Sequence, residues 1–301
     1  IRSYEVTHYL LDHYINMTNY KNRKSVILKS EQFELDSVIG QGGQGRIFSA
    51  RNSADNSPVV IKQIDISDYV EKINFRNEME VLKMLKRLNL EYLCEIYDYA
   101  EKGDLGYIAM KRYNCDLFDF AIVKHGVSEE LGKILFRAIV KGIMNLHSAG
   151  IAHMDIKPDN IFLDNEQNTF IGDFGSCYVF KNNKRCCIRR GTKEYYPPEY
   201  AYQKSFDPRK VDVYCLGVTL YALLTGCYPY NFQDPIEFRV IDISDNLSPD
   251  CRNLLFKMLQ EKPNKRISLK KVLKHPWLSE TSTPSFKQTY CTVFTQKLKR
   301  F

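Results

Sequence analysis

Two neighbouring stretches of the chain decide its fold: His-Met-Asp-Ile-Lys-Pro-Asp-Asn at residues 153–160 and Gly-Asp-Phe-Gly at residues 172–175. Asp155 and Asn160 lie on the first stretch, which reads as a short loop, and Asp173 lies on the second. Three oxygen-bearing side chains that converge on one point can supply a general base and the ligands of a hard cation such as Mg²⁺. The pattern therefore predicts metal-assisted phosphate chemistry.

A glycine-rich segment, Gly-Gln-Gly-Gly-Gln-Gly at residues 40–45, lies upstream between two strand-like runs. Glycines let a turn approach phosphate oxygens and present backbone N–H groups without side-chain obstruction. A dinucleotide site with this spacing needs a helix directly after the glycines, whereas Arg-Ile-Phe-Ser-Ala at residues 46–50 is typical of a strand. Taken alone, the segment is also consistent with a merely flexible hairpin, so its interpretation depends on the residues downstream of it.

A lysine and a glutamate come next in the chain, where a phosphate site needs them. Lys62 ends the apolar strand-like run Val-Val-Ile-Lys at residues 59–62, and Glu78 lies on the helical stretch after it. A buried ammonium needs a carboxylate partner, and such a pair can hold the α- and β-phosphates of a nucleotide. Either residue alone would be interpreted as a surface charge, but together with the glycines they predict a nucleotide site.

The hydrophobic pattern changes character along the chain. Short β-type runs predict a small antiparallel sheet at Phe33–Ile39, Arg46–Ala50, Val59–Ile64, Glu95–Tyr99 and Tyr107–Met110, interrupted by one helix at Phe75–Leu88. Beyond Asn114 the spacing is helical, with helices expected at Glu129–Ala149, Val211–Thr225, Pro249–Gln260 and Leu269–Lys274. The sequence therefore predicts an α+β fold with a β-rich lobe, a helical lobe and a cleft between them.

These motifs stand in the order found in eukaryotic protein kinases, which the chain resembles from Phe33 to about Leu278. Further matches are Pro-Pro-Glu at residues 197–199, the late Arg266, and a His-Pro-Trp ending similar to that of calmodulin-dependent-like kinases. The resemblance implies a bilobal kinase fold with the ATP cleft between the lobes. The expected divisions are an extension with an amphipathic helix at 1–30, an N-lobe and hinge at 31–113, a C-lobe at 114–278 and a tail at 279–301.

The resemblance also assigns roles in the transfer of the γ-phosphoryl group of ATP to a protein hydroxyl. It implies four catalytic residues, which are Lys62, Glu78, Asp155 and Lys157. Lys62 would hold the α- and β-phosphates and pair with Glu78. Asp155 would orient the acceptor hydroxyl and take its proton, while Lys157 would steady the γ-phosphate.

The cofactors implied by the resemblance are ATP and Mg²⁺, with Asn160 and Asp173 as metal ligands. The residues expected to contact ATP come from the glycine loop, the sheet, the hinge and the floor of the adenine slot: Gly40, Gly42, Gly45, Ile47, Val60, Lys62, Met110, Tyr113, Asp116 and Phe162. Met110 is the expected gatekeeper, and an alignment shifted by one residue would put Ala109 there instead.

Met154 departs from the family pattern, because an arginine usually precedes the catalytic aspartate and often binds a phosphorylated activation loop. Between the Asp-Phe-Gly and Pro-Pro-Glu motifs the hydroxyls are few: besides Thr192 and two tyrosines near the end, there are only Ser176 and Tyr178. We therefore expect activity that does not depend on phosphorylation of this loop.

Two signals bear on the acceptor residue. Gly191-Thr192 and the Pro-Pro-Glu motif resemble serine/threonine kinases, in which Lys157 and the threonine interact with the catalytic aspartate. The catalytic loop itself resembles Wee-type kinases, which act on tyrosine. Serine or threonine is the expected acceptor, since the first signal is tied more closely to the acceptor site, and a Wee-like tyrosine or dual-specificity kinase is the alternative.

A protein substrate with basic residues near its acceptor is one interpretation of two acidic positions, and the other is a nucleotide contact. Asp116 and Asp159 fall at positions that contact arginines in some basophilic kinases, although Asp116 also fits a bond to the ATP ribose.

Two further classes are rivals. A pseudokinase scaffold would bind nucleotide without turnover, yet all the residues expected for catalysis and metal binding are present. A small-molecule kinase of the aminoglycoside or choline type shares the His-x-Asp and Asn loop, but those enzymes lack the Lys157-Pro158 pair and the His-Pro-Trp ending.

Composition bears on partners and compartment. The 301 residues are 44% hydrophobic and 26% charged, which is ordinary for a globular protein. The net charge of +7 is spread over the chain apart from clusters at 181–190 and 297–300, so neither a nucleic acid nor a membrane is an expected partner. Nine cysteines without a disulfide framework fit a reducing compartment, the cytoplasm or the nucleus. Nothing in the sequence indicates an oligomeric state.

Overall fold

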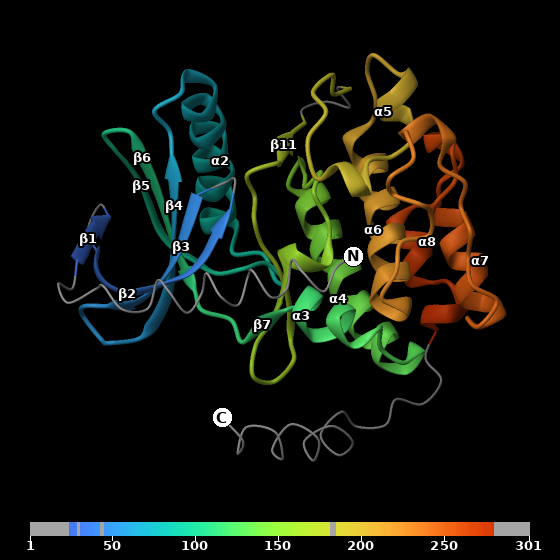
Figure 1. The fold of residues 1–301 in the computed structure, drawn as a ribbon, viewed down its shortest axis with the longest axis horizontal. Helices are drawn as coiled ribbons and strands as arrows, with labels where there is room; N and C mark the ends of the chain where they lie inside the picture. Colours follow the sequence, from blue (N-terminus) through green and yellow to red (C-terminus); the bar gives the residue numbers. More distant parts are fainter. Residues whose placement is uncertain (1–23, 29–30, 43–44, 181–184, 280–301) are drawn as a thin grey trace.

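The computed structural model describes residues 24–28, 31–42, 45–180 and 185–279. The helix expected near the start of the chain and the tail beyond residue 279 lie outside these residues. Figure 1 shows a sheet-rich lobe with one long helix on one side and a helical lobe on the other. The bilobal α+β architecture predicted from the sequence is therefore confirmed.

The N-lobe is built on a six-stranded antiparallel sheet in the order β1-β2-β3-β4-β6-β5. Its strands are β1 (Lys24–Leu28), β2 (Glu31–Gly42), β3 (Gly45–Asn52), β4 (Pro58–Asp65), β5 (Ile96–Lys102) and β6 (Leu105–Lys111). Helix α2 (Tyr69–Leu88) packs beside them, and the side chain of Asp68 caps its N-terminus by accepting from two backbone N–H groups. The sheet begins earlier than the boundary expected at residue 31, because β1 pairs with β2 along its whole length.

The two faces of this sheet bury different side chains. Phe48, Ala50, Val59, Ile61 and Ala109 face outward into a hydrophobic cluster of their own, here called the outer cluster, which also contains Val26, Leu28, Phe33 and Tyr107. The opposite face looks toward α2 and the C-lobe, where Ile64, Phe75, Leu82 and Ile108 join the main core. Strand alternation thus separates residues that stabilise the lobe from residues that line the space between the lobes.

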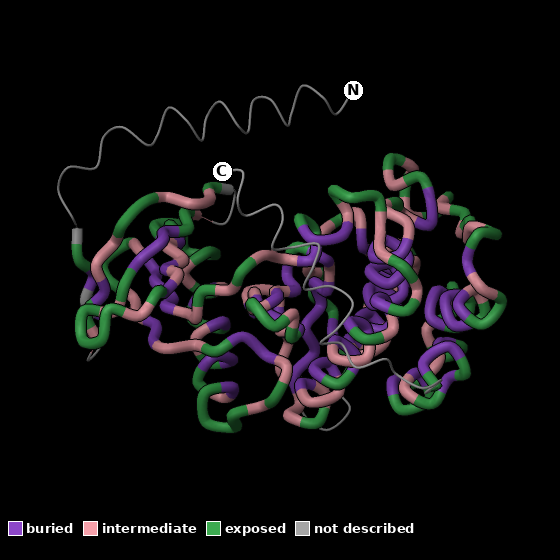
Figure 2. The backbone as a smooth tube through the Cα atoms, turned by 90° about the horizontal axis from the view of Figure 1, so that it is seen from below, coloured by how far each residue is buried: buried purple, intermediate pink, exposed green. Residues whose placement is uncertain are grey.

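The C-lobe is mainly helical: α3 (Leu117–Ala121), α4 (Glu129–Ser148), α5 (Glu199–Tyr202), α6 (Pro208–Thr225), α7 (Pro249–Met258) and α8 (Leu269–Leu273). Every residue of α6 from Val211 to Leu224 is buried, because this stretch is apolar on nearly all its faces. Figure 2 shows long buried stretches inside the helical lobe. Short strands carry the functional loops: β7 (Cys115–Asp116), β8 (Ile151–Ala152), β9 (Ile161–Leu163), β10 (Thr169–Ile171) and β11 (Tyr178–Val179).

Among the described residues, no helix has both the length and the apolar character needed to cross a bilayer. The apolar stretch at 211–224 is instead the centre of α6, inside the core.

Candidate active site

Lys62 lies on the cleft face of β4, opposite Ile47 of β3 and Ile108 of β6. Its ammonium crosses to the other lobe, where Nζ lies 2.7 Å from Oδ1 of Asp173. Burial would lower the pKa of Lys62, but the charges of Asp173 and Glu78 outweigh burial and raise this pKa above its usual value. The lysine is therefore held as a cation at the point where the two lobes meet.

Glu78 projects from α2 toward the same point and is only 6% exposed. A side chain at Gly175 would lie 3.3 Å from Oε2 of Glu78, which shows how closely the helix approaches the Gly-Asp-Phe-Gly segment. Burial raises the pKa of Glu78 above its usual range; the charge of Lys62 opposes this rise, and the charge of Asp173 adds to it. Lys62, Glu78 and Asp173, far apart in the sequence, thus form one electrostatic group.

The loop that carries the catalytic motif is fixed by Asp212 of α6. Its two carboxylate oxygens accept hydrogen bonds from the backbone N–H of His153 at 2.9 Å and of Met154 at 2.7 Å. Met154 has φ of +63°, a left-handed conformation that is unfavourable for methionine, so these bonds hold a strained backbone. His147 of α4 also lies 2.7 Å from the same carboxylate.

Asp155 emerges from this loop, and its two carboxylate oxygens are held unequally, by a short hydrogen bond at Oδ1 and a longer one at Oδ2. Oδ1 accepts from the backbone N–H of Thr192 at 2.9 Å, while Oδ2 lies 3.3 Å from Nδ2 of Asn160 and 3.8 Å from Nζ of Lys157. Lys157 itself donates to the hydroxyl of Thr192 at 2.8 Å. A weakly bound carboxylate oxygen beside an ammonium can accept a proton from a hydroxyl next to a phosphate.

Asn160 and Asp173 offer oxygens suited to a divalent metal ion. Asn160 donates through Nδ2 to the backbone oxygen of Asp155 at 2.8 Å, which leaves its Oδ1 as an acceptor. Within the described residues, no group of three or more His, Cys, Asp or Glu side chains forms a metal cage. Two oxygen ligands are nevertheless enough for Mg²⁺, which usually takes one or two protein ligands together with substrate phosphates and water.

The upper side of the nucleotide site comes from the cleft face of the sheet. Val60 lies opposite Met110, so both side chains are on the same face as Lys62 and Ile47. Ala109 faces the outer cluster instead, and the sheet register therefore favours Met110 over Ala109 at the gatekeeper position.

The glycine loop joins β2 to β3, with Gly40 opposite Ile47 and Gly42 opposite Gly45. Gly45 has φ of +123°, and a Cβ there would lie 2.0 Å from the backbone oxygen of Gln63, so only glycine fits. Residues 43–44 lie outside the described part of the loop.

The lower side and the hinge contain three of the expected residues. The Tyr113 ring lies 5.8 Å from the ring of Phe162, and its hydroxyl accepts from the N–H of Glu95 at 3.0 Å. These contacts occupy the Tyr113 side chain, so its backbone is what it can offer a nucleotide. Asp116 is paired with Phe162 across β7 and β9 and caps α3 by accepting from the N–H of Asp119 at 2.8 Å.

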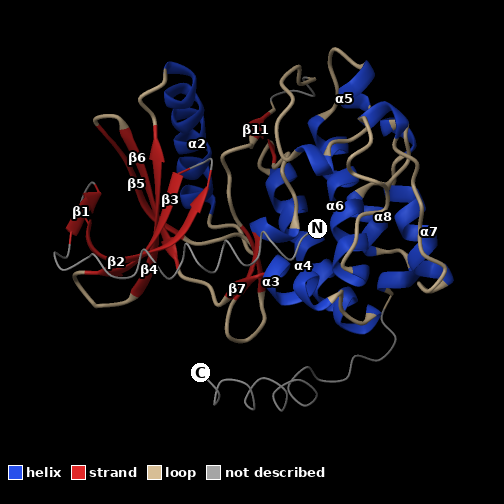
Figure 3. Cartoon of the chain, viewed as in Figure 1, coloured by secondary structure: helices blue, strands red, loops and turns tan. Residues whose placement is uncertain are grey.

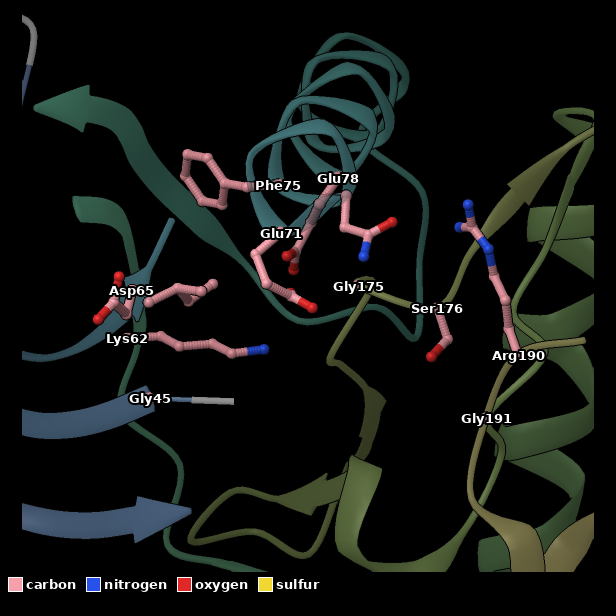
Figure 4. A pocket seen from close by; sticks show the side chains of 12 residues that line it. Gly45, Lys62, Asp65, Glu71, Phe75, Glu78, Gly175, Ser176, Arg190 and Gly191 are labelled. Carbon is pink, nitrogen blue, oxygen red and sulfur yellow. The ribbon is translucent and has the colours of Figure 1, made fainter. Parts of the chain in front are cut away.

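A cavity of about 490 Å³ opens between the lobes beside this group. Figure 4 shows Lys62 reaching into it from β4, Glu78 from α2, and Ser176 and Arg190 on the far side, from the segment after Asp173. The side of this cavity that faces away from β4 and α2 is lined by Gly175, Ser176, Arg190 and Gly191.

Some residues of the site carried no recognisable pattern in the sequence. His147 is one histidine in an amphipathic helix, and only the fold brings it to Asp212. Arg190 donates to the backbone oxygen of Cys177 at 2.6 Å, a contact between positions that no motif connects. By contrast, Arg266 and the Pro-Pro-Glu glutamate, both of which the sequence singles out, form an ion pair, since Nη1 of Arg266 lies 2.7 Å from Oε1 of the fully buried Glu199.

Comparison with known proteins agrees with this geometry. The family described as protein kinase domain matches residues 33–278. Maternal embryonic leucine zipper kinase of Xenopus tropicalis is 31% identical over 263 residues, which cover 82% of this chain and 39% of that protein. The counterpart in Danio rerio is 31% identical over 267 residues, with shares of 84% and 39%. CBL-interacting protein kinase 5 of Oryza sativa subsp. japonica is 28% identical over 276 residues, with shares of 87% and 59%. The chain thus spans only part of the length of these relatives. It belongs to the protein kinase domain family.

Proposed function

We propose that the chain transfers the γ-phosphoryl group of Mg²⁺-ATP to serine or threonine hydroxyls of proteins. Membership of the family makes it a protein kinase that uses ATP and a divalent metal ion. The observation that supports the acceptor class is the link from Lys157 through Thr192 to Asp155. Because Lys157 and Thr192 lie beside the catalytic carboxylate, we expect a short aliphatic hydroxyl to reach it more easily than the bulky ring of a tyrosine.

The reaction then depends on the positions of these groups. Lys62 would hold the α- and β-phosphates, and Asn160 and Asp173 would hold the metal ion, whose positive charge would offset negative charge on the transferred group. The acceptor hydroxyl binds at Oδ2 of Asp155, which takes its proton as the new O–P bond forms and the bond to the ADP oxygen breaks. Lys157 lies between Asp155 and Thr192 and balances negative charge on the γ-phosphoryl group.

We further propose that this activity does not require phosphorylation of the loop between the Asp-Phe-Gly and Pro-Pro-Glu motifs. Met154, where the family often has arginine, is 1% exposed and packs in the core. Described residues of the loop are held instead by the segment that follows Pro-Pro-Glu: Cys186 and Phe206 exchange two backbone hydrogen bonds at 2.8 and 2.9 Å, and Arg185 donates to the hydroxyl of Ser205 at 3.0 Å. Arg190 fixes the other end through Cys177.

The test is phosphate transfer to a degenerate peptide library by phosphatase-treated protein, followed by identification of the phosphorylated residue. We expect phosphoserine or phosphothreonine, with Asp155→Asn lowering kcat by about 10²- to 10⁴-fold. Phosphotyrosine would favour the Wee-like alternative. ATP binding without turnover in the untreated protein would favour a pseudokinase. Activity abolished by phosphatase, with the lost phosphate mapped to 173–199, would refute independence from loop phosphorylation.

Two finer proposals concern the substrate and the compartment. Three carboxyl groups lie close enough together for their charges to interact: Asp116, Asp119 and Asp159. Such a group of negative charges would attract basic residues near the acceptor, which supports a preference for them. The same library measures this preference, and Asp159→Asn should weaken it. The cysteine content supports a cytoplasmic or nuclear location, which imaging of a tagged chain in its own cells would test.

A further inference from the structure

Arg239 donates hydrogen bonds to backbone carbonyl groups of two separate segments of the C-lobe. It comes directly after the short 3₁₀ turn Ile236–Phe238, between α6 and α7, and is half-buried. Its guanidinium donates to the carbonyl oxygens of Lys193 at 3.2 Å, Phe232 at 3.3 Å, Asp234 at 3.4 Å, and Glu194 and Tyr196 at 3.5 Å. Within the described residues Arg239 forms no salt bridge, so its charge faces carbonyl dipoles and the ring of Tyr230 rather than a carboxylate.

Three of these carbonyls belong to the segment Lys193–Tyr196, which comes directly after Thr192. Thr192 touches the reaction centre, because its N–H donates to Asp155 and its hydroxyl accepts from Lys157. The segment is tied to it in turn, since the N–H of Tyr195 donates to the oxygen of Thr192 at 2.9 Å. Arg239 therefore holds the backbone of residues 193–196, here called the strip, which directly follows the residue bound to the catalytic carboxylate.

Aromatic side chains also contact Arg239 and the segment Lys193–Tyr196. The guanidinium lies 4.8 Å from the ring centre of Tyr230, whose hydroxyl donates to the oxygen of Glu194 at 2.7 Å. The ring of Tyr228 packs against Tyr195 at 5.5 Å. Tyr230 and Arg239 thus share one acceptor on Glu194, and the loop after α6 binds the strip by two neighbouring groups.

We propose that Arg239 is a positioning residue for the protein substrate. It holds residues 193–196 so that the acceptor segment of a substrate lies along them and its hydroxyl reaches Asp155. A guanidinium suits this task because its donors point in several fixed directions in one plane, whereas a lysine ammonium cannot reach both segments at once. The role rests on the proposed transfer to protein hydroxyls, and it concerns substrate binding rather than the chemical step.

The kinetic test compares Arg239→Met and Arg239→Lys with Arg252→Met. Arg252 is a matched control, because it pairs with Asp245 on the surface of the same lobe. We expect both Arg239 variants to raise the peptide KM roughly tenfold or more, the scale of a lost charge-assisted hydrogen bond. The KM for ATP and the rate of ATP hydrolysis without peptide should stay at the wild-type values. An equal fall in peptide-free hydrolysis, or an unchanged peptide KM, would overturn the proposal.

Tyr230→Phe is the milder variant, since it removes one hydroxyl and keeps the ring. It should raise the peptide KM in the same direction, and its effect should be smaller when Arg239 is already methionine, because both groups act on Glu194. Simple additivity of the two changes would contradict a shared role.

Hydrogen exchange provides a readout that does not depend on peptide phosphorylation. In Arg239→Met, the amides of residues 192–196 should exchange faster, while those of residues 153–160 keep their protection. Unchanged exchange at 192–196 would refute the positioning role even if the wild type phosphorylated no peptide. Failure of the proposed function would instead appear as a wild type that transfers phosphate to no serine or threonine.

Discussion

The surroundings of Asp116 disfavour the ionised form of its carboxyl group. Burial raises its pKa to about 6; the hydrogen bond from Asp119 opposes this rise, and the charges of Asp119 and Asp159 add to it. A carboxyl whose pKa is higher in the folded state binds more protons there than in the unfolded state. Between the two pKa values, stability therefore falls as pH rises.

We expect Asp116→Asn to stabilise the nucleotide-free protein by about 1 kcal/mol near neutral pH, a value reduced for the solvent that reaches this side chain. The gain should shrink toward about pH 5 as the wild-type carboxyl becomes protonated. Asparagine removes the charge and keeps the cap on α3, so Asp116→Asn isolates the charge, and Asp116→Ala is the control that also loses the cap. Urea unfolding at the two pH values measures the effect, and a pH-independent difference would contradict it.

Single residues differed in how far the sequence could predict them. The roles predicted for Asp155, Asn160 and Asp173 rest on residue types in a fixed order with fixed spacing, and these roles stay predictions. His147 and Arg239 could not be assigned, because an isolated histidine or arginine resembles a surface charge until distant loops meet it. The acceptors of Arg239 are backbone carbonyls, which leave no trace in the residue types around it.

Glu129, at the start of α4, connects three elements of the C-lobe. Oε1 accepts from the N–H of Ser248 at 2.7 Å, and Oε2 accepts from the Ser248 hydroxyl and from Nε1 of Trp277, both at 2.6 Å. Burial works against the charged form, but the hydrogen bonds from Ser248 and Trp277 outweigh it and lower the pKa of Glu129. The resulting stability is present at neutral pH and is lost as pH falls through the lowered pKa.

Glu129→Gln should therefore cost about 1–3 kcal/mol of unfolding free energy at neutral pH, because the amide nitrogen would face a donor. Glu130→Gln is the matched control, since Glu130 is exposed on the same turn of α4. Denaturant unfolding followed by the fluorescence of Trp277 reports directly on the contact. Equal stability of the two variants would show that the junction contributes nothing.

Elements with a long regular pattern could be predicted, and short ones could not. The five strands and five helices expected within the described residues are all present, although α2 begins at Tyr69 rather than Phe75, because Asp68 caps it further upstream. The strands β7 to β11 are two or three residues long and are defined by pairing, which leaves too short an alternation to recognise. β1 was missed because it lies within a stretch without clear periodicity.

The pair formed by Glu199 and Arg266 ties the segment after the active site to the end of the C-lobe. Both side chains have no exposure, and Arg266 also donates to the carbonyl oxygens of Gln260 at 2.8 Å and Lys210 at 2.8 Å. Arg266→Met would leave the carboxylate of Glu199 buried without its partner. We expect a loss of about 3–5 kcal/mol in unfolding free energy, measured by urea unfolding.

The double variant Glu199→Met/Arg266→Met separates the cost of an orphaned charge from the value of the pair. It should be more stable than Arg266→Met alone, because no buried charge is then left. A double variant less stable than the single one would mean that the pair stabilises the fold beyond cancelling its own burial.

At the scale of the whole molecule, the division into two lobes could be predicted from the change in hydrophobic pattern near Asn114. The sequence alone did not indicate which face of the sheet belongs to which core. Strand alternation fixes which residues share a face, but only the packing of α2 decides which face turns toward the C-lobe.

The boundary between the two hydrophobic cores therefore does not coincide with the boundary between the two lobes. Helix α2 and the cleft face of the sheet belong to the same continuous core as the C-lobe, while β1, β2 and the outer face have their own. In terms of cooperativity, we expect the outer layer to open at a lower free energy than the main core, since its cluster is the smaller of the two and contains no residue of α2. A substitution at Phe33 or Ile61 should then destabilise the sheet on the nucleotide side of the cleft while α2 stays packed. A substitution at Leu82 should instead destabilise the main core, which both lobes share.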